Sequence, residues 1–123
     1  MDDISITLLH QRLRNRIMEV LEMISTKSFV PKLGTDELTE LWYDFVDAEK
    51  LESYNSPVFT IEEQDALRRF YDLLECHYDE IPTTHSLDEL SSSESWRIVS
   101  ESAASELAVF MERGYLDEES EVT

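Results

Sequence analysis

A chain of 123 residues with 41% apolar side chains is long enough to bury a core as one domain and too apolar to be wholly disordered. Its ten basic and 28 acidic side chains give a net charge of −18 at pH 7, which disfavours binding to nucleic acids and anionic membranes and favours encounter with basic partners. The single cysteine, Cys76, excludes an intramolecular disulfide and a multi-cysteine zinc site.

The distribution of charge and of turn-forming residues narrows the fold class. Residues 1–33 hold five basic and four acidic side chains (net +1), whereas residues 34–123 hold five and 24 (net −19). Only two glycines and three prolines occur, which leaves few of the tight turns of an all-β chain. The sequence shows no secretory signal and no run of roughly 20 apolar residues. We therefore expect a soluble, cytoplasmic, helical protein.

The first predicted helix covers roughly residues 5–25. Arg12, Arg14 and Arg16 lie off its apolar stripe, and we expect them to pair with acidic helices of the same bundle, because so acidic a protein is poorly suited to binding phosphates. The segment FVPKLG at 29–34 is predicted to be a loop from its proline and glycine. The apolar stripe recurs mostly every three or four residues: Ile6, Leu9, Leu13, Ile17, Val20, Leu21 and Ile24.

A second helix is predicted from about Asp36 to Ser53, with Thr35 or Asp36 as its N-cap. At 100° per residue its apolar side chains share one arc, and its acidic side chains share the opposite arc. The apolar arc holds Leu38, Leu41, Trp42, Phe45 and Ala48. The acidic arc holds Asp36, Glu40, Asp44 and Asp47, with Tyr43 and Tyr54 flanking it.

Local helix stability does not explain this acidic arc. Like charges four residues apart destabilise a helix by about 0.2–0.5 kcal/mol per pair, and Lys50 is the only basic residue between residues 33 and 67. Solubility would account for the charges, and packing against a neighbouring helix would account for Tyr43 and Tyr54. Rigid tyrosines among charges are also typical of binding hot spots, so we predict a partner-binding surface here.

A third helix opens with the capping box of Thr60 and Glu63 and ends before Pro82. A binding role for its outer face would use the same acidic chemistry as the second helix. Its predicted core residues are Leu67, Phe70, Tyr71, Leu74 and Tyr78. Its outer face carries Asp65, Arg68, Asp72, Glu75 and Asp79.

The fourth main helix follows the serine run 91–93, after one short helical turn predicted at 86–90. Ser91 and Glu94 have the spacing of a capping box, and Arg113 with Gly114 marks the C-terminal end. Its apolar stripe is Trp96, Val99, Ala103, Leu107 and Phe110. Residues 115–123 are predicted to be a frayed acidic tail. The predicted fold class is all-α: a compact bundle of four main helices and one extra short helix, in a single domain over residues 1–123.

The sequence contains no motif for catalysis, cofactor binding or metal binding. It has no HExxH, no Glu-x-x-His pair of the di-iron type and no glycine-rich loop for a phosphate. Glu75, Cys76 and His77 are consecutive, and consecutive helical residues point about 100° apart, so they cannot converge on a metal by themselves. We interpret Cys76 as a small buried side chain and expect no enzymatic activity, no cofactor and no small-molecule substrate.

The acidic faces of residues 36–54 and 62–79, the chain length, the helical pattern and the lack of a signal peptide resemble the small acidic immunity proteins with which bacteria neutralise secreted or contact-delivered nuclease toxins. This resemblance implies a cytoplasmic, stoichiometric inhibitor without enzymatic activity, whose partner is one cognate basic toxin. Its carboxylates would occupy phosphate-like positions on the toxin. The predicted partner-binding residues are Asp36, Glu40, Tyr43, Asp44, Asp47, Tyr54, Asp65, Asp72 and Asp79.

Two other functions remain open. An acidic mimic of DNA, aimed at a host nuclease or DNA-binding protein, would act by the same mechanism on another target. A helical adaptor or regulatory subunit of a cytoplasmic complex, homodimeric through an apolar face, belongs to a different class. It is suggested by the side chains that make the first helix apolar on a second side, namely Ile4, Leu8, Met18 and Met23.

Overall fold

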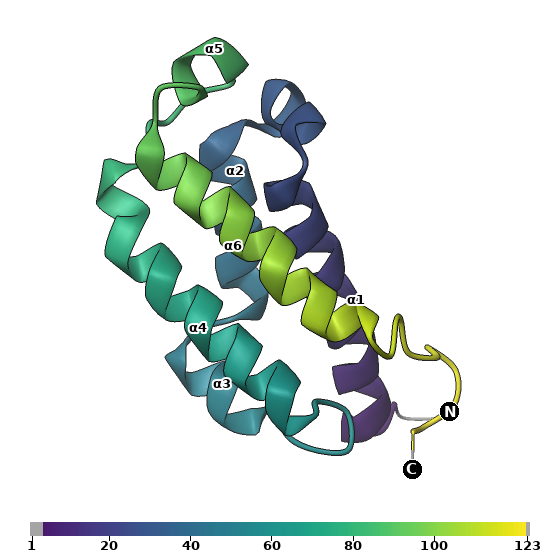
Figure 1. Cartoon of the computed structure of the whole chain (residues 1–123). Coiled ribbons are helices and arrows are strands. Elements are labelled where there is room, and N and C mark those ends of the chain that lie inside the picture. Colours follow the sequence, from purple (N-terminus) through teal and green to yellow (C-terminus); the bar gives the residue numbers. More distant parts are fainter. Residues whose placement is uncertain (1–3, 123) are drawn as a thin grey trace.

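The structure, a computed structural model, describes residues 4–122, and every regular element in that range is helical (Figure 1). The all-α prediction is therefore confirmed. Four α-helices are long: α1 (Ile6–Ser25), α2 (Val30–Phe45), α4 (Ile61–His77) and α6 (Glu94–Met111). Two are short, α3 (Ala48–Ser53) and α5 (Leu87–Leu90), where the sequence predicted one short helix. Two 3₁₀ turns, η1 (Lys27–Phe29) and η2 (Tyr78–Glu80), complete the order.

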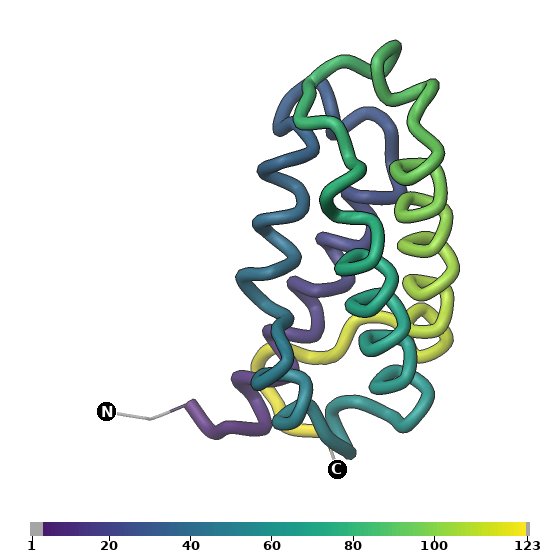
Figure 2. Tube along the Cα trace, turned by 90° about the vertical axis from the view of Figure 1, so that its left-hand side faces the viewer, coloured from purple at the N-terminus to yellow at the C-terminus, as the bar shows by residue number. Residues whose placement is uncertain are grey.

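The four long helices form a bundle in which α6 packs against both α1 and α4, and α1 packs against α2. In Figure 2, α4 runs along the centre, with α2 to its left and α6 to its right. Trp42 of α2 meets Phe70 of α4 edge to face, with ring centroids 4.7 Å apart, and both rings are fully buried. Burying a large apolar side chain contributes about 1.5–3 kcal/mol, so this pair is a main attachment between α2 and α4.

A buried ion cluster ties the middle of α1 to the first turn of α4 and to the residues just after α6. Arg14 and Glu63 are both excluded from solvent, and their side chains pair at 2.8 Å. Arg113 reaches the other oxygen of Glu63 at 2.6 Å, and Arg14 donates to the carbonyl of Gly114 at 2.8 Å. The expected pairing of the α1 arginines with acidic helices of the same bundle is thus confirmed for Arg14. Arg16 instead pairs with Glu19 of its own helix and with Glu118 of the tail, and Arg12 donates to the backbone carbonyl of Glu118.

The segment predicted as a loop at 29–34 is instead mostly helical. Val30 to Phe45 form one helix with a kink at Gly34, whose φ of 80° and ψ of 159° lie outside the helical region. Pro31 sits in the first turn of α2, where a missing N–H costs nothing. The proline therefore marks the start of a helical turn rather than a loop, whereas Gly34 interrupts the helix at the position where the sequence predicted the end of the loop.

The second predicted helix is not continuous to Ser53. Val46 is extended (φ −135°, ψ 119°), and Asp47 caps the new helix α3 by accepting from the Lys50 amide at 2.7 Å. The Tyr54 hydroxyl donates to the carbonyl of Phe45 at 2.5 Å, which satisfies the open C-terminal end of α2. Asp47 and Tyr54 therefore stabilise the break between two helices, instead of extending one acidic face.

The remaining helix ends agree with the sequence in part. The capping box of Thr60 and Glu63 is confirmed at the start of α4, and the amide of Gly114 donates to Phe110 just beyond α6. The cap of α6 is Ser93, which accepts from the Trp96 amide, and not Ser91. Three serines in a row offered three equivalent caps, so the local sequence could not select one.

The acidic tail, expected to fray, lies along the lower half of α1 (Figure 1). Asn15 forms a two-way amide pair with the backbone of Leu116, at 2.8 and 3.0 Å. Gln11 donates to the carbonyl of Ser120 at 2.8 Å and accepts from the Val122 amide at 2.7 Å. The side-chain amides of Gln11 and Asn15 are buried. They supply hydrogen bonds to backbone groups of the tail, which has no regular secondary structure to satisfy them.

Replacing Gln11 with methionine should release the end of the tail without unfolding the bundle. The variant keeps the length of the side chain and removes its hydrogen bonds to Asp117, Ser120 and Val122. Each lost hydrogen bond contributes about 0.5–1.5 kcal/mol, because water can reach the backbone groups that are freed in the tail. Hydrogen exchange of the Val122 amide should accelerate strongly, while the Leu116 amide, held by Asn15, should keep its protection. Equal exchange of Val122 in both proteins would show that Gln11 does not hold the tail.

Candidate functional site

A cluster of three tyrosines lies between α2 and α4 and is the centre of the candidate site. Tyr43 meets Tyr71 and Tyr78 edge to face, with ring centroids 6.3 and 5.9 Å apart. The Tyr43 hydroxyl donates to Glu75 at 3.2 Å. Tyr43 and Tyr71 are half-buried, while Tyr78 is 40% exposed. These three residues, called the tyrosine cluster below, present aromatic surface next to a carboxylate.

The surroundings of Tyr43 and Tyr71 favour the neutral form of their phenol groups, and the pKa of each is raised. Burial raises the pKa of Tyr43 far above its ordinary value of 10, and the neighbouring Glu75 adds to that rise. Glu75 also raises the pKa of Tyr71. Away from the cluster, burial raises the pKa of Tyr54 to about 12, with a smaller contribution from Asp47. Tyr43 and Tyr71 therefore keep their hydroxyl protons through the neutral pH range.

The raised tyrosine pKa values predict a loss of stability in alkali. A tyrosine whose pKa is higher in the folded chain stabilises the fold fully below its unfolded value near 10, and that contribution is lost as the pH rises through the folded value. Ultraviolet titration of tyrosinate should lag in the native protein relative to the urea-unfolded protein. The Tyr43→Phe variant should narrow that lag, and identical titration curves for native and unfolded protein would contradict the prediction.

The acidic side chains of α2 stand beside this cluster. Asp36, Glu40 and Asp44 are exposed, and each is displaced by about 40° around the helix from the one before. None of them takes part in the ion pairs found among residues 4–122. Lys50, the base closest to Asp44 in the sequence, pairs with Asp47 and donates to the backbone carbonyl of Asp44. The carboxylates of these three residues are thus left for an external cation.

Tyr54 does not lie on the acidic surface predicted for it. It is 2% exposed and stacks on Phe59 with ring centroids 4.7 Å apart. Its apolar ring completes the core beneath α3, so a partner would have to unfold this region to reach it. Asp47 is half-buried and occupied as the α3 cap. Both residues therefore belong to the structural support of the site rather than to its surface.

The predicted acidic residues of α4 face another side of the molecule. Asp72 lines an open groove between α4 and α6 together with Cys76 and Ser102. Asp65 lies seven residues earlier on the same flank, and Asp79 is exposed in η2. The nine predicted residues therefore do not form one surface. Cys76 is exposed in this groove, so its interpretation as a buried side chain was wrong.

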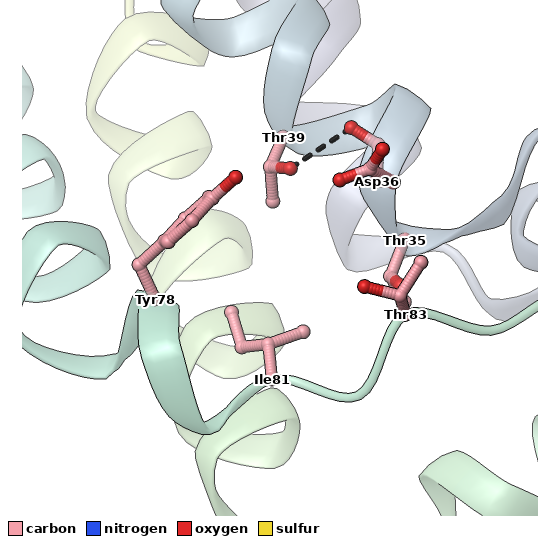
Figure 3. Close-up of a pocket in the computed structure, with 6 residues that line it drawn as sticks. All are labelled: Thr35, Asp36, Thr39, Tyr78, Ile81 and Thr83. Carbon is pink, nitrogen blue, oxygen red and sulfur yellow. Dashed lines mark hydrogen bonds between the residues drawn. The ribbon is translucent and has the colours of Figure 1, made fainter.

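A small polar pocket adjoins the tyrosine cluster at the upper end of α2 (Figure 3). Its volume is about 50 Å³. Tyr78 forms one wall, and the segment after η2 closes the pocket from the other side. The lining residues are Thr35, Asp36, Thr39, Tyr78, Ile81 and Thr83.

The sequence placed Tyr78 in the core and did not identify the pocket. Tyr71 and Tyr78 are seven residues apart and fall at the edge of the apolar arc of α4, which is a weak signal for a side chain that bridges core and surface. Thr83 belongs to a segment with no periodic pattern. Only the folding of residues 81–84 against α2 brings it beside Asp36.

Among residues 4–122 no group of three or more His, Cys, Asp or Glu side chains is arranged to hold a metal ion. In the same part of the chain, no helix combines the length and the apolar character needed to span a membrane. Comparison with protein-family models, with curated proteins and with solved structures finds no match to this chain. The function must therefore be argued from the geometry of the site.

Proposed function

We propose that the protein is a binding module that recognises a basic protein surface through α2 and the tyrosine cluster. The observation that carries this proposal is the combination of unpaired carboxylates at Asp36, Glu40 and Asp44 with a partly exposed aromatic cluster beside them. Several basic side chains of the bundle pair with carboxylates elsewhere: Arg14 with Glu63, Arg69 with Glu106, and Arg97 with Glu94 and Glu101.

Two physical effects contribute to binding: long-range electrostatic attraction and close aromatic contact. The net charge of −18 attracts a basic partner over a distance and accelerates encounter, and salt screens this attraction. Close contact is then made by Tyr78 and Tyr43, because tyrosine offers a large rigid surface at a small entropic cost. Such a surface is fixed before the partner arrives, since Tyr43 is already held by Glu75 and by the other two rings.

Within this class, the function we favour is that of a stoichiometric inhibitor which neutralises a basic nuclease toxin in the cytoplasm, as immunity proteins do. A nuclease must bind phosphates, so its active surface is basic. Carboxylates at the spacing of one helical turn along α2 would occupy phosphate positions on that surface and exclude the substrate. The inhibitor needs no catalytic group for this role, and an acidic mimic of DNA would act in the same way on a host protein.

The alternative of an adaptor or homodimer is favoured by one observation. Ile4, Ile6 and Leu9 are 53, 68 and 41% exposed at the start of α1. Half of the second apolar side of α1 is covered within the bundle, since Met18 is buried and Met23 packs against the core. Sedimentation at two salt concentrations separates the alternatives: a dimer indifferent to salt supports the adaptor, and a monomer supports the inhibitor.

The direct test is a pulldown from lysate of the source organism at low and moderate salt, with three proteins as bait. The first is the native chain, and the second combines Asp36→Asn, Glu40→Gln and Asp44→Asn. The third is a control with the same change of charge on exposed acids elsewhere: Glu22→Gln, Asp88→Asn and Glu112→Gln.

We expect the native chain and the control to capture one basic protein in a one-to-one complex that salt weakens, and the α2 variant to lose it. Nuclease activity of the captured protein, blocked by the native chain, would establish the inhibitor. Retention of the same partner by the α2 variant at low salt would refute the proposed surface. Recovery of the chain alone, or of a complex indifferent to salt, would favour the adaptor.

A further inference from the structure

The pocket beside the tyrosine cluster is built by contacts between segments far apart in the sequence. The Thr35 hydroxyl donates to the carbonyl of Pro82 at 2.6 Å and accepts from the Thr84 amide at 3.1 Å. The Thr35 amide in turn donates to the carbonyl of Thr84 at 3.0 Å. These three bonds fix residues 82–84 against the kink of α2. The pocket is therefore preformed, which lowers the entropic cost of filling it.

The groups that line the pocket favour a cation. Asp36 contributes a carboxylate that enters none of the ion pairs among residues 4–122. Thr39 also lines the pocket, and because its hydroxyl donates its proton to the backbone carbonyl of Asp36 at 2.9 Å, its oxygen can still accept a hydrogen bond. Thr83 and Tyr78 add two further hydroxyl oxygens, and the ring of Tyr78 adds an aromatic wall (Figure 3).

The volume of the pocket limits the size of that cation. The space of about 50 Å³ compares with about 30 Å³ for one water molecule in the liquid. It accommodates an ammonium group with its neighbouring methylene. An ammonium group has three donors and no acceptor, which matches a carboxylate and several hydroxyl oxygens. The planar guanidinium of arginine is broader and directs its five donors in a fixed fork.

We propose that this pocket receives the ammonium group of a lysine side chain presented by the basic partner. The inference rests on the proposed function and deepens it, because it assigns one anchoring contact within the recognised surface. The lysine enters beside Tyr78, its ammonium group contacts Asp36, Thr39 and Thr83, and its methylene chain lies along Ile81 and the ring of Tyr78.

The test uses the full chain and three small probes: N-acetyl-lysine methylamide, its arginine counterpart and its uncharged norleucine counterpart. Proton–nitrogen correlation spectra report binding through the amide signals of Thr39 and Thr83. Two variants make a matched pair, since Asp36→Asn and Asp44→Asn each remove one exposed carboxylate from α2, and only Asp36 lines the pocket.

We expect saturable shifts at Thr39 and Thr83 with the lysine probe and none with norleucine. Asp36→Asn should weaken lysine binding about tenfold, as expected for a hydrogen bond to a charged group, and Asp44→Asn should change it by less than about twofold, the effect of a surface charge. Equal effects of the two variants, equal shifts with norleucine, or tighter binding of arginine than of lysine would each overturn the lysine assignment.

The outcomes separate this inference from the proposed function. A chain that fails to bind lysine selectively, yet loses its basic partner when the three α2 carboxylates are neutralised, refutes the pocket and retains the surface. A chain that binds lysine at Asp36 but keeps its partner after that neutralisation supports the pocket and refutes the proposed function.

Discussion

Replacing Glu63 with glutamine is expected to lower the free energy of unfolding by about 3–5 kcal/mol, because removing one partner leaves a buried charge uncompensated. Arg14 is fully buried, and its guanidinium pairs with both oxygens of Glu63 at 3.1 and 2.8 Å. Arg113 uses the same carboxylate. A domain of this size is stable by about 5–15 kcal/mol, so this one substitution removes a large part of the total. Urea denaturation followed by circular dichroism measures the change.

The control is Glu62→Gln, which removes the same charge one residue earlier, at an exposed position in the first turn of α4. It should cost well under about 1 kcal/mol. A double variant, Arg14→Met with Glu63→Leu, removes both buried partners and should be more stable than Glu63→Gln. If Glu63→Gln and Glu62→Gln are equally stable, the cluster does not hold the middle of α1, the start of α4 and the end of α6 together.

The same cluster gives the protein an acid-sensitive component of stability. Burial alone would raise the pKa of Glu63, but the hydrogen bonds from Arg14 and Arg113 outweigh it and lower the pKa below its ordinary 4.5. The stabilisation is therefore fully present above pH 4.5, the unfolded value, and is lost as the pH falls through the lower folded value. Stability measured below pH 4.5 should fall less steeply in Glu63→Gln than in the native chain.

Glu63 also shows which parts of the fold were open to prediction. Its capping role depends on Thr60, three residues away, and the local sequence predicted it correctly. Its partners Arg14 and Arg113 lie 49 and 50 residues away. Such distant pairing produces no periodic pattern in the sequence, and the sequence alone does not distinguish a buried glutamate from a surface glutamate. The helices could be predicted because their apolar pattern repeats every few residues. The ion cluster could not be predicted because it has no such pattern.

The break between α2 and α3 after Phe45 could not be predicted from the sequence for a related reason. The apolar arc of the predicted helix continues in phase to Ala48, so the pattern alone favours one long helix. The break is stabilised by Asp47, a cap residue that also fits an acidic helical face, and by the distant contact of Tyr54 with the carbonyl of Phe45. Asp47 fits both a continuous helix and a break followed by a new helix, so the sequence does not distinguish these two interpretations.

The candidate site likewise has one part that the helical pattern predicts and another part that depends on tertiary packing. Asp36, Glu40 and Asp44 were placed on the exposed side of one helix by the helical period, and they are exposed there. The pairing of Tyr43 with Tyr78, and the approach of Thr83 to Asp36, come from the packing of α2 against the end of α4 and the segment after it. The sequence could thus predict the charged side of the site but not its aromatic cluster or its pocket.

Replacing Gly34 with alanine is expected to be the second most damaging change. At φ 80° and ψ 159°, Gly34 occupies a region that is almost closed to other residues, and forcing alanine into it costs about 1–3 kcal/mol. An added Cβ would also lie 2.9 Å from two atoms of the His85 ring. The ring would have to move, and with it the segment that Thr35 and Thr84 hold against α2. Thermal and urea unfolding measure the loss.

Two further variants separate backbone strain from the collision with His85. Gly114 has a similar φ of 76°, and a Cβ there would meet nothing within 4 Å, so Gly114→Ala reports the cost of a positive φ in open space, about 1–2 kcal/mol. Gly34→Ala combined with His85→Ala removes the collision and should recover part of the loss. Because Thr35 anchors the pocket wall, Gly34→Ala should also shift the Thr83 amide signal, which Gly114→Ala should leave in place. If the two glycine substitutions lower the free energy of unfolding equally, the segment around His85 moves aside without a measurable energetic cost. A pocket wall that moves so easily could not hold a preformed site.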